Sequence, residues 1–120
     1  MKQRSIIKPD PNLQNNLMAF GFDCGEGWYP LIEETLDKIE KELENYPELK
    51  NDFEITQIKE KFGMLVIYTS FITDEIEKII DEAENKSMTI CEVCGESGEL
   101  RERNHWLVTL CDKHFEERNK

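Results

Sequence analysis

Apolar residues recur at helical spacing in the stretch between Pro30 and Pro47. They lie three or four positions apart and therefore share one face of a helix: Ile32, Leu36, Ile39 and Leu43. Proline fits the first turn of a helix, and a second proline ends such a run. The pattern predicts a helix that begins at Pro30, ends before Pro47 and buries one face in a core.

Two later segments, Phe53 to Lys59 and Met64 to Phe71, are rich in β-branched and aromatic residues. Gly63 lies in the link between them and can adopt the positive φ that a tight turn requires. We therefore expect these segments to pair as a β-hairpin.

A second helix is predicted from Asp74 to about Lys86. Asp74 and Glu77 form an Asp-x-x-Glu capping pattern at its start. Apolar positions then follow at helical spacing: Ile76, Ile79, Ile80 and Ala83. After this helix, a short extended segment at residues 88–90 is expected to lead into Cys91.

The first thirty residues show no such period. Residues 1–19 are polar, which predicts an irregular N-terminal arm. Residues 20–29 interleave three glycines with four aromatic residues, so we expect an ordered loop that anchors aromatic side chains on the core. Cys24 lies in this loop with no histidine near it in sequence and is interpreted as a plain thiol. The chain then divides into the arm, an α+β body at 20–90 and a zinc-binding module at 91–120.

The C-terminal module contains a C-x-x-C pair, Cys91 and Cys94, and a C-x-x-H pair, Cys111 and His114. Zinc binds four such ligands tetrahedrally, and a two-residue spacer lets one tight turn present two of them to the same ion. Gly95 directly follows the first pair, where it relieves the turn. Because the four ligands fill the coordination shell, the sequence predicts one structural zinc ion per chain. The alternatives are a redox pair at Cys91 and Cys94 or a coincidence of buried cysteines.

Two short segments between the ligand pairs, Glu99 to Arg103 and Trp106 to Leu110, predict a second hairpin that turns at Asn104 and His105. His105 is then a turn residue rather than a ligand, and the unit resembles a zinc ribbon or a treble clef. The predicted fold class is α+β: two helices packed on a small antiparallel β-sheet, with a zinc knuckle at the C-terminal end.

Acidic residues outnumber basic residues by 26 to 15, which gives a formal net charge of −11. Most of the excess lies between residues 31 and 90, where sixteen acidic and seven basic residues occur. A nucleic-acid-binding domain usually presents a basic face, so the charge argues against that partner and favours a basic protein. The sequence contains no apolar run long enough to cross a bilayer and no secretory signal, so we expect a cytoplasmic protein without a membrane partner.

Four cations are candidates for binding a small anionic ligand: Lys59, Lys61, Arg101 and Arg103. Alternation along a strand places the two lysines on one side of their segment and the two arginines on one side of theirs. The alternative is that these cations pair with acidic neighbours in the sequence: Glu60, Glu99 and Glu102.

Four strings of the sequence carry a resemblance to known proteins: Cys24 to Ile32, Lys59 to Gly63, Cys91 to Gly95 and Cys111 to His114. They resemble the motifs of a family of small phage and prophage proteins, over roughly residues 20–115. That family has Gly-Asp-Gly-Trp before its first helix, a Lys-Glu-Lys-Phe-Gly-Gly-Leu-Arg hairpin and the same zinc knuckles. Here Glu26 replaces the aspartate, Met64 the second hairpin glycine and Val66 the arginine, so an anion site built on that arginine is not expected. The resemblance implies a phage or prophage genome and a zinc site, and it implies no activity.

Three classes of function stay open at this point. The first is a non-enzymatic, zinc-stabilised binding protein of phage type that engages a host protein, for instance a defence factor, in the host cytoplasm. The second is a binder or sponge of a small anionic ligand such as a nucleotide immune signal. The third is a nucleic-acid-binding zinc ribbon, which the net charge disfavours. An enzyme is not expected, because the sequence has no phosphate loop, catalytic triad or open metal site. A homo-oligomer is compatible with each class.

Overall fold

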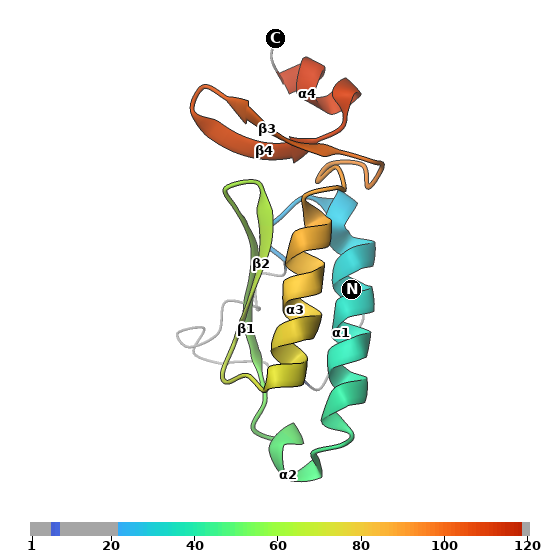
Figure 1. Ribbon diagram of the computed structural model, residues 1–120, viewed down its shortest axis with the longest axis vertical. Helices are drawn as coiled ribbons and strands as arrows, with labels where there is room; N and C mark the ends of the chain where they lie inside the picture. The colour runs from blue at the N-terminus through green and yellow to red at the C-terminus, as the bar shows by residue number, and fades with distance from the viewer. Residues whose placement is uncertain (1–5, 8–21, 119–120) are drawn as a thin grey trace.

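Two long helices and two β-hairpins form most of the computed structural model, which describes residues 6–7 and 22–118 (Figure 1). The elements follow in this order: η2 (Glu26–Trp28), α1 (Tyr29–Leu43), α2 (Pro47–Lys50), β1 (Ile55–Lys61), β2 (Met64–Thr69), α3 (Asp74–Ser87), β3 (Glu99–Arg103), β4 (Trp106–Leu110) and α4 (Asp112–Arg118). The fold is α+β, as predicted. Apart from residues 6 and 7, the predicted arm lies outside the described residues. No helix in the described part of the chain is long and apolar enough to span a membrane.

Helix α1 begins at Tyr29 with Pro30 in its first turn, where the sequence predicts the start. Its apolar face is buried: Leu31, Ile32, Leu36, Ile39 and Leu43. The helix ends at Leu43, and the chain turns before Pro47. Tyr46 leaves the helical region with φ −133° and ψ 67°, as a residue that precedes proline tends to do. Pro47 then starts the short helix α2.

Strands β1 and β2 form an antiparallel hairpin with a two-residue turn at Phe62 and Gly63. Both turn residues have positive φ, 53° and 81°, which is the arrangement of a type I′ turn. A carboxylate oxygen of Glu60 accepts a hydrogen bond of 2.7 Å from the Gly63 N–H and holds the turn. The strand β1 therefore runs to Lys61, two residues beyond the predicted end.

Both edges of this small sheet are covered. On the β2 side, the Leu65 N–H donates to the Ser87 hydroxyl at 3.0 Å, and the Ile67 N–H donates to the Glu84 carboxylate at 3.3 Å. On the β1 side, the Ile55 N–H donates to the Ile6 carbonyl at 2.8 Å, and Asp23 forms a parallel bridge with Lys59. Helix α3 thus protects one edge from pairing with another chain, and segments before α1 protect the other.

Helix α3 is capped by Thr73, whose hydroxyl accepts a hydrogen bond of 3.3 Å from the Ile76 N–H. The prediction of Asp74 as the cap is wrong by one residue. Thr73 has the extended backbone of a cap, φ −102° and ψ 164°, whereas Asp74 is already helical. Asp74 and Glu77 lie in the first turn, where negative charge favours the helix dipole.

The chain after α3 does not form the predicted extended segment at residues 88–90. Met88 and Thr89 form a turn, and Ile90 alone pairs with Ser97 in an isolated bridge. The second hairpin, by contrast, has the predicted bounds. Its turn consists of Asn104 and His105, with φ of 53° and 67°.

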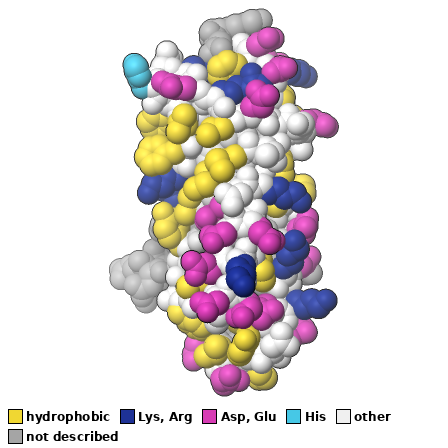
Figure 2. Space-filling view, viewed as in Figure 1, with side chains coloured by type: hydrophobic (Ala, Val, Ile, Leu, Met, Phe, Trp, Pro, Cys, Tyr) yellow, Lys and Arg dark blue, Asp and Glu magenta, His cyan; other side chains and the backbone are white. Residues whose placement is uncertain are grey.

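The excess negative charge lies on the helices. Together α1 and α3 contain eleven acidic and four basic residues. Figure 2 shows acidic side chains spread over the part of the surface where these helices lie. The polar face of each amphipathic helix is turned to solvent.

The Thr73→Ala substitution should lower the free energy of unfolding by about 1 kcal/mol, because the first turn of α3 would lose the acceptor for the Ile76 N–H. The measurement is urea unfolding followed by circular dichroism. Asp74→Ala, the matched control, removes a first-turn charge but no cap and should cost less. A larger loss for Asp74→Ala would contradict the assignment of the cap.

Candidate metal centre

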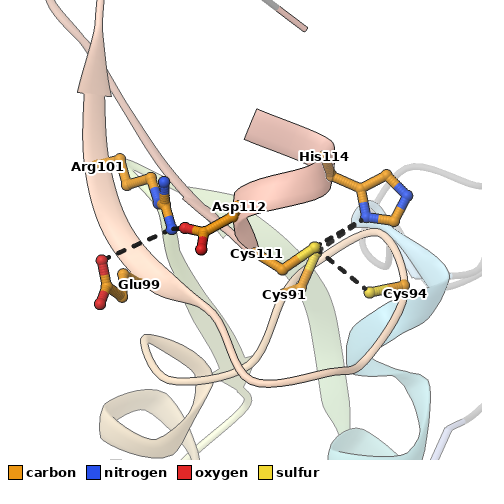
Figure 3. A network of polar contacts seen from close by, with 7 residues as sticks. All are labelled: Cys91, Cys94, Glu99, Arg101, Cys111, Asp112 and His114. Carbon is orange, nitrogen blue, oxygen red and sulfur yellow. Dashed lines mark hydrogen bonds and ion pairs between the residues drawn. The ribbon is translucent and has the colours of Figure 1, made fainter. Parts of the chain in front are cut away.

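Four metal-binding side chains converge at the end of the molecule that carries the second hairpin (Figure 3). Cys91 and Cys94 come from the loop between α3 and β3, Cys111 directly follows β4, and His114 lies in the first turn of α4. Gly95 has a φ of 82°, the left-handed region that lets the chain turn after the first pair. The second pair joins a strand end to a helix, so the order is knuckle, hairpin, helix. That is the order of a treble clef rather than of a zinc ribbon.

The donor atoms are spaced as one ion would hold them. The sulfur atoms of Cys94 and Cys111 are 3.8 Å apart, and His114 Nδ1 lies 3.6 Å from the Cys91 sulfur and 3.2 Å from the Cys111 sulfur. All four donors lie within 4.8 Å of one another. A tetrahedral zinc ion with its usual bond lengths would separate its ligands by about 3.6 to 3.8 Å. The group can hold one metal ion, and three thiolates with one imidazole are a typical zinc set.

The Cys91 thiol is prepared for ionisation by its surroundings. Burial raises its pKa, but hydrogen bonds from backbone groups outweigh burial and lower the pKa of Cys91 to about 6. These groups belong to Cys111, Cys94 and Val93. At Cys94 a backbone hydrogen bond from Glu96 lowers the pKa, while partial desolvation and the neighbouring sulfur atoms raise it overall. Adjacent thiols ionise together only when a cation offsets their charge, and a bound metal ion supplies that cation.

Arg101 fixes the helix that carries His114. Its guanidinium forms ion pairs with Asp112, the first residue of α4, and with Glu99 at 3.6 Å (Figure 3). The same group lies over the Phe115 ring, 4.9 Å from its centroid. On the other side of the imidazole, Nε2 of His114 faces the Glu117 carboxylate at 3.9 Å. A metal-binding histidine is commonly oriented by such an outer carboxylate.

The knuckle rests on the loop that precedes α1. The Gly27 N–H donates to the Glu92 carbonyl and the Gly25 N–H donates to the Glu92 carboxylate, each at 2.8 Å. The indole N–H of the fully buried Trp28 donates to the Ile90 carbonyl, also at 2.8 Å. The Gly-x-Gly-Trp string therefore binds the backbone around the first ligand pair, a role that the sequence analysis did not assign to it.

Close approach of the two backbones explains why this loop contains glycines. A Cβ atom added to Gly27 would lie 2.2 Å from the Cys91 carbonyl oxygen, and one added to Gly25 would lie 2.3 Å from the Glu92 carbonyl oxygen. Real atoms do not approach so closely, and both neighbours are backbone rather than flexible side chains. Any larger residue would push the knuckle away from the loop.

A second contact joins the turn of the first hairpin to strand β4 of the second. The Thr109 hydroxyl, which is buried in β4, donates to the Gly63 carbonyl at 2.5 Å. A Cβ atom on Gly63 would lie 2.6 Å from the Leu100 side chain. The Lys-Glu-Lys-Phe-Gly string thus also meets the metal-binding module, so the motifs of the resemblance lie on both sides of one junction.

The four candidate cations are divided between two sheets. Lys59 and Lys61 lie on β1, whereas Arg101 and Arg103 lie on β3. Arg101 pairs with Glu99, as the alternative interpretation predicts. Glu60 and Glu102, the other two acidic residues of that interpretation, contact the Gly63 N–H and the His105 ring instead. A ligand-binding role for the four cations stays a prediction.

His105 and Cys24, the remaining histidine and cysteine of the chain, lie outside the metal group. His105 is 99% exposed and occupies the hairpin turn. Cys24 is a half-buried thiol: burial raises its pKa, and nearby carboxylates raise it further, to about 12. These carboxylates belong to Glu92, Asp23 and Glu60. The Cys24 thiol stays protonated at neutral pH and lacks the thiolate that a nucleophile needs.

Compared with known proteins, the chain matches no family model, and no curated protein or solved structure matches it either. The structure supports one part of the sequence resemblance, the knuckle with its Cys91, Cys94, Cys111 and His114 cluster. The phage or prophage setting rests on the sequence strings alone.

The metal group can be tested by native mass spectrometry of protein purified without added metal. We expect the mass of one zinc ion per chain, and we expect Cys111→Ala and His114→Ala to lose it because each removes one of four ligands. Cys24→Ala is the matched control and should retain the ion. Metal retained by Cys111→Ala, or lost by Cys24→Ala, would contradict the assigned ligands.

The Gly27→Ala substitution should destabilise the protein by more than about 2 kcal/mol, because the new methyl group would overlap the Cys91 carbonyl. Urea unfolding measures the loss, and metal content reports on the knuckle. Glu26→Ala at the neighbouring exposed position should change stability by less than about 0.5 kcal/mol. Equal stability of Gly27→Ala and Glu26→Ala would show that the close approach is unimportant.

Proposed function

We propose that the protein is a non-catalytic binding protein whose C-terminal module is stabilised by one structural zinc ion. Three cysteines and one histidine of the chain supply a complete tetrahedral set, whereas catalytic zinc keeps a position open for water or substrate. The ion would therefore contribute folding free energy rather than chemistry.

The observation that carries the binding role is a set of large apolar side chains left in solvent where the two hairpins meet. We call it the hairpin patch, and it consists of Phe62, Leu100 and Leu107. Phe62 is 63% exposed. Trp106 is also exposed, but it pairs with Arg103 across the hairpin and therefore lies on the opposite face from Leu100. Figure 2 shows apolar side chains gathered on this side of the molecule, beside the second hairpin. Grouped exposed apolar residues mark interaction sites, and aromatic side chains dominate the binding energy of many interfaces.

The arrangement of the junction explains how the patch is presented. The turn at Gly63 lies against Leu100 and the backbone of Leu107, so side chains from both sheets border one another. The zinc ion and the loop before α1 would hold this surface rigid, which lowers the entropic cost of binding. The resemblance to phage and prophage proteins makes a protein of the bacterial host the first partner to seek. The acidic helices favour a partner with basic surroundings.

A pull-down from host lysate tests this proposal. The tagged protein should retain a host protein at moderate salt, and Phe62→Ala should reduce its recovery at least about tenfold, since a central aromatic contact is worth about 2 kcal/mol or more. Phe62 is largely exposed, so its loss should leave the metal content unchanged. Lys78→Ala on α3 is the control for a distant surface change. Failure to recover any partner, or equal recovery with Phe62→Ala, would count against a binding role for the patch.

A further inference from the structure

The outer edge of β3 is open, in contrast to the edges of the first sheet. There, backbone groups of β1 bond to segments before α1, and those of β2 bond to α3. Strand β3 has β4 on one side, and within the described residues no strand pairs with its other side. An edge with unpaired N–H and C=O groups is a template for an added strand.

The register of the hairpin shows which backbone groups face outward. Arg103 and Trp106 flank the two-residue turn as a hydrogen-bonded pair, so every second residue of β3 turns its backbone groups toward β4. The alternate residues of β3, Leu100 and Glu102, turn their N–H and C=O groups to the open side. No backbone hydrogen bond from another described segment reaches these two residues. The edge thus offers ladder positions with the spacing of a normal strand pair.

The cations on one face of β3 differ in their partners. Arg101 is engaged by Asp112 and Glu99. Arg103 makes no ion pair with a described residue. Its Nη1 atom is buried without a hydrogen-bond partner, as is Nε of Arg101. The other two nitrogen atoms of the half-buried Arg103 guanidinium, Nε and Nη2, can bind a carboxylate through two parallel hydrogen bonds.

The opposite face of the edge is apolar at one point. Leu100 is 44% exposed and lies against Gly63, the residue that follows the exposed Phe62. Leu100 and Arg103 are three residues apart and therefore point to opposite faces of the strand. A strand added at this edge would meet the leucine on one face and the arginine on the other.

We propose that the open edge of β3 binds an extended peptide segment of a partner protein, which joins the β3–β4 sheet as a third strand. A carboxylate of this segment pairs with Arg103. An apolar side chain three positions away, on the opposite face, packs on Leu100 and Phe62. The inference rests on the proposed function, because it specifies the segment by which the partner is held.

The charge of the chain favours such a segment over other occupants. A net charge of −11 repels a polyanionic nucleic acid and a second copy of the chain over long range. Most of that charge lies on α1 and α3, and the Debye length at physiological salt is about 8 Å. A short peptide at β3 is therefore screened from much of the field and meets Arg103 at close range.

The test uses an array of short synthetic peptides with a Thr/Val background that carry one Asp and one Leu three positions apart. The zinc-loaded full chain should bind them about tenfold more tightly than matched peptides with Asn in place of Asp, because a charge-assisted hydrogen bond is lost. A proline placed between the Asp and the Leu should abolish binding, since it removes a ladder donor. These comparisons need no change in the protein.

Arg103→Gln should remove the preference for Asp over Asn and keep both the metal and the weaker binding, whereas Lys50→Gln on α2 should behave as the unmodified chain. Equal binding of Asp and Asn peptides, tolerance of the proline, or no binding at all would overturn the proposal. A dimer that Arg103→Gln dissociates would also overturn it, by assigning the edge to a second copy. A silent array beside a host partner whose binding depends on Phe62 would overturn the edge site alone and leave the binding function standing.

Discussion

The Gly25–Trp28 loop contacts residues 90–92, and this contact joins the metal centre to the main core. On one side this loop leads into α1 and buries Trp28 in the main core. On the other side it receives the turn that carries two of the four metal ligands. Displacement of that turn would leave the buried indole N–H without an acceptor, which costs about 1–3 kcal/mol. The main core and the metal centre are therefore not independent units.

The C-terminal module needs this contact because its own core is small. Its buried apolar residues are Cys91, Val108 and Leu110, with a few partly buried neighbours. So little apolar burial does not offset the entropy of ordering a hairpin and a helix. The proposed zinc ion, the ion pairs of Arg101 and the docking of the hairpin on Gly63 supply the remaining stabilisation. The rigid surface that results carries the hairpin patch and the open edge of β3.

Sequence reasoning identifies the metal ligands and both hairpins because this information is local. Each ligand pair spans one turn, and each hairpin turn contains a residue that tolerates positive φ, Gly63 or Asn104. It places the cap of α3 one residue late, because threonine and aspartate both cap helices well and only the backbone of Thr73 distinguishes them. The junction is not predictable in this way. Its hydrogen bonds join Gly25 to Glu92 and Trp28 to Ile90, pairs that are separated by 67 and 62 positions in the sequence. Hydrophobic periodicity does not indicate which distant segments meet.

Hydrogen exchange of the backbone amides, followed by mass spectrometry with and without a zinc chelator, tests the dependence of the junction on the metal most directly. The Gly27 N–H bonds across the junction to Glu92, and the Glu92 N–H bonds to Thr109 of β4. Our account predicts that metal removal accelerates exchange at Gly27 and Glu92, while the interior of α1 around Ile39 keeps its protection. Unchanged exchange at Gly27 and Glu92 after complete metal removal would contradict it.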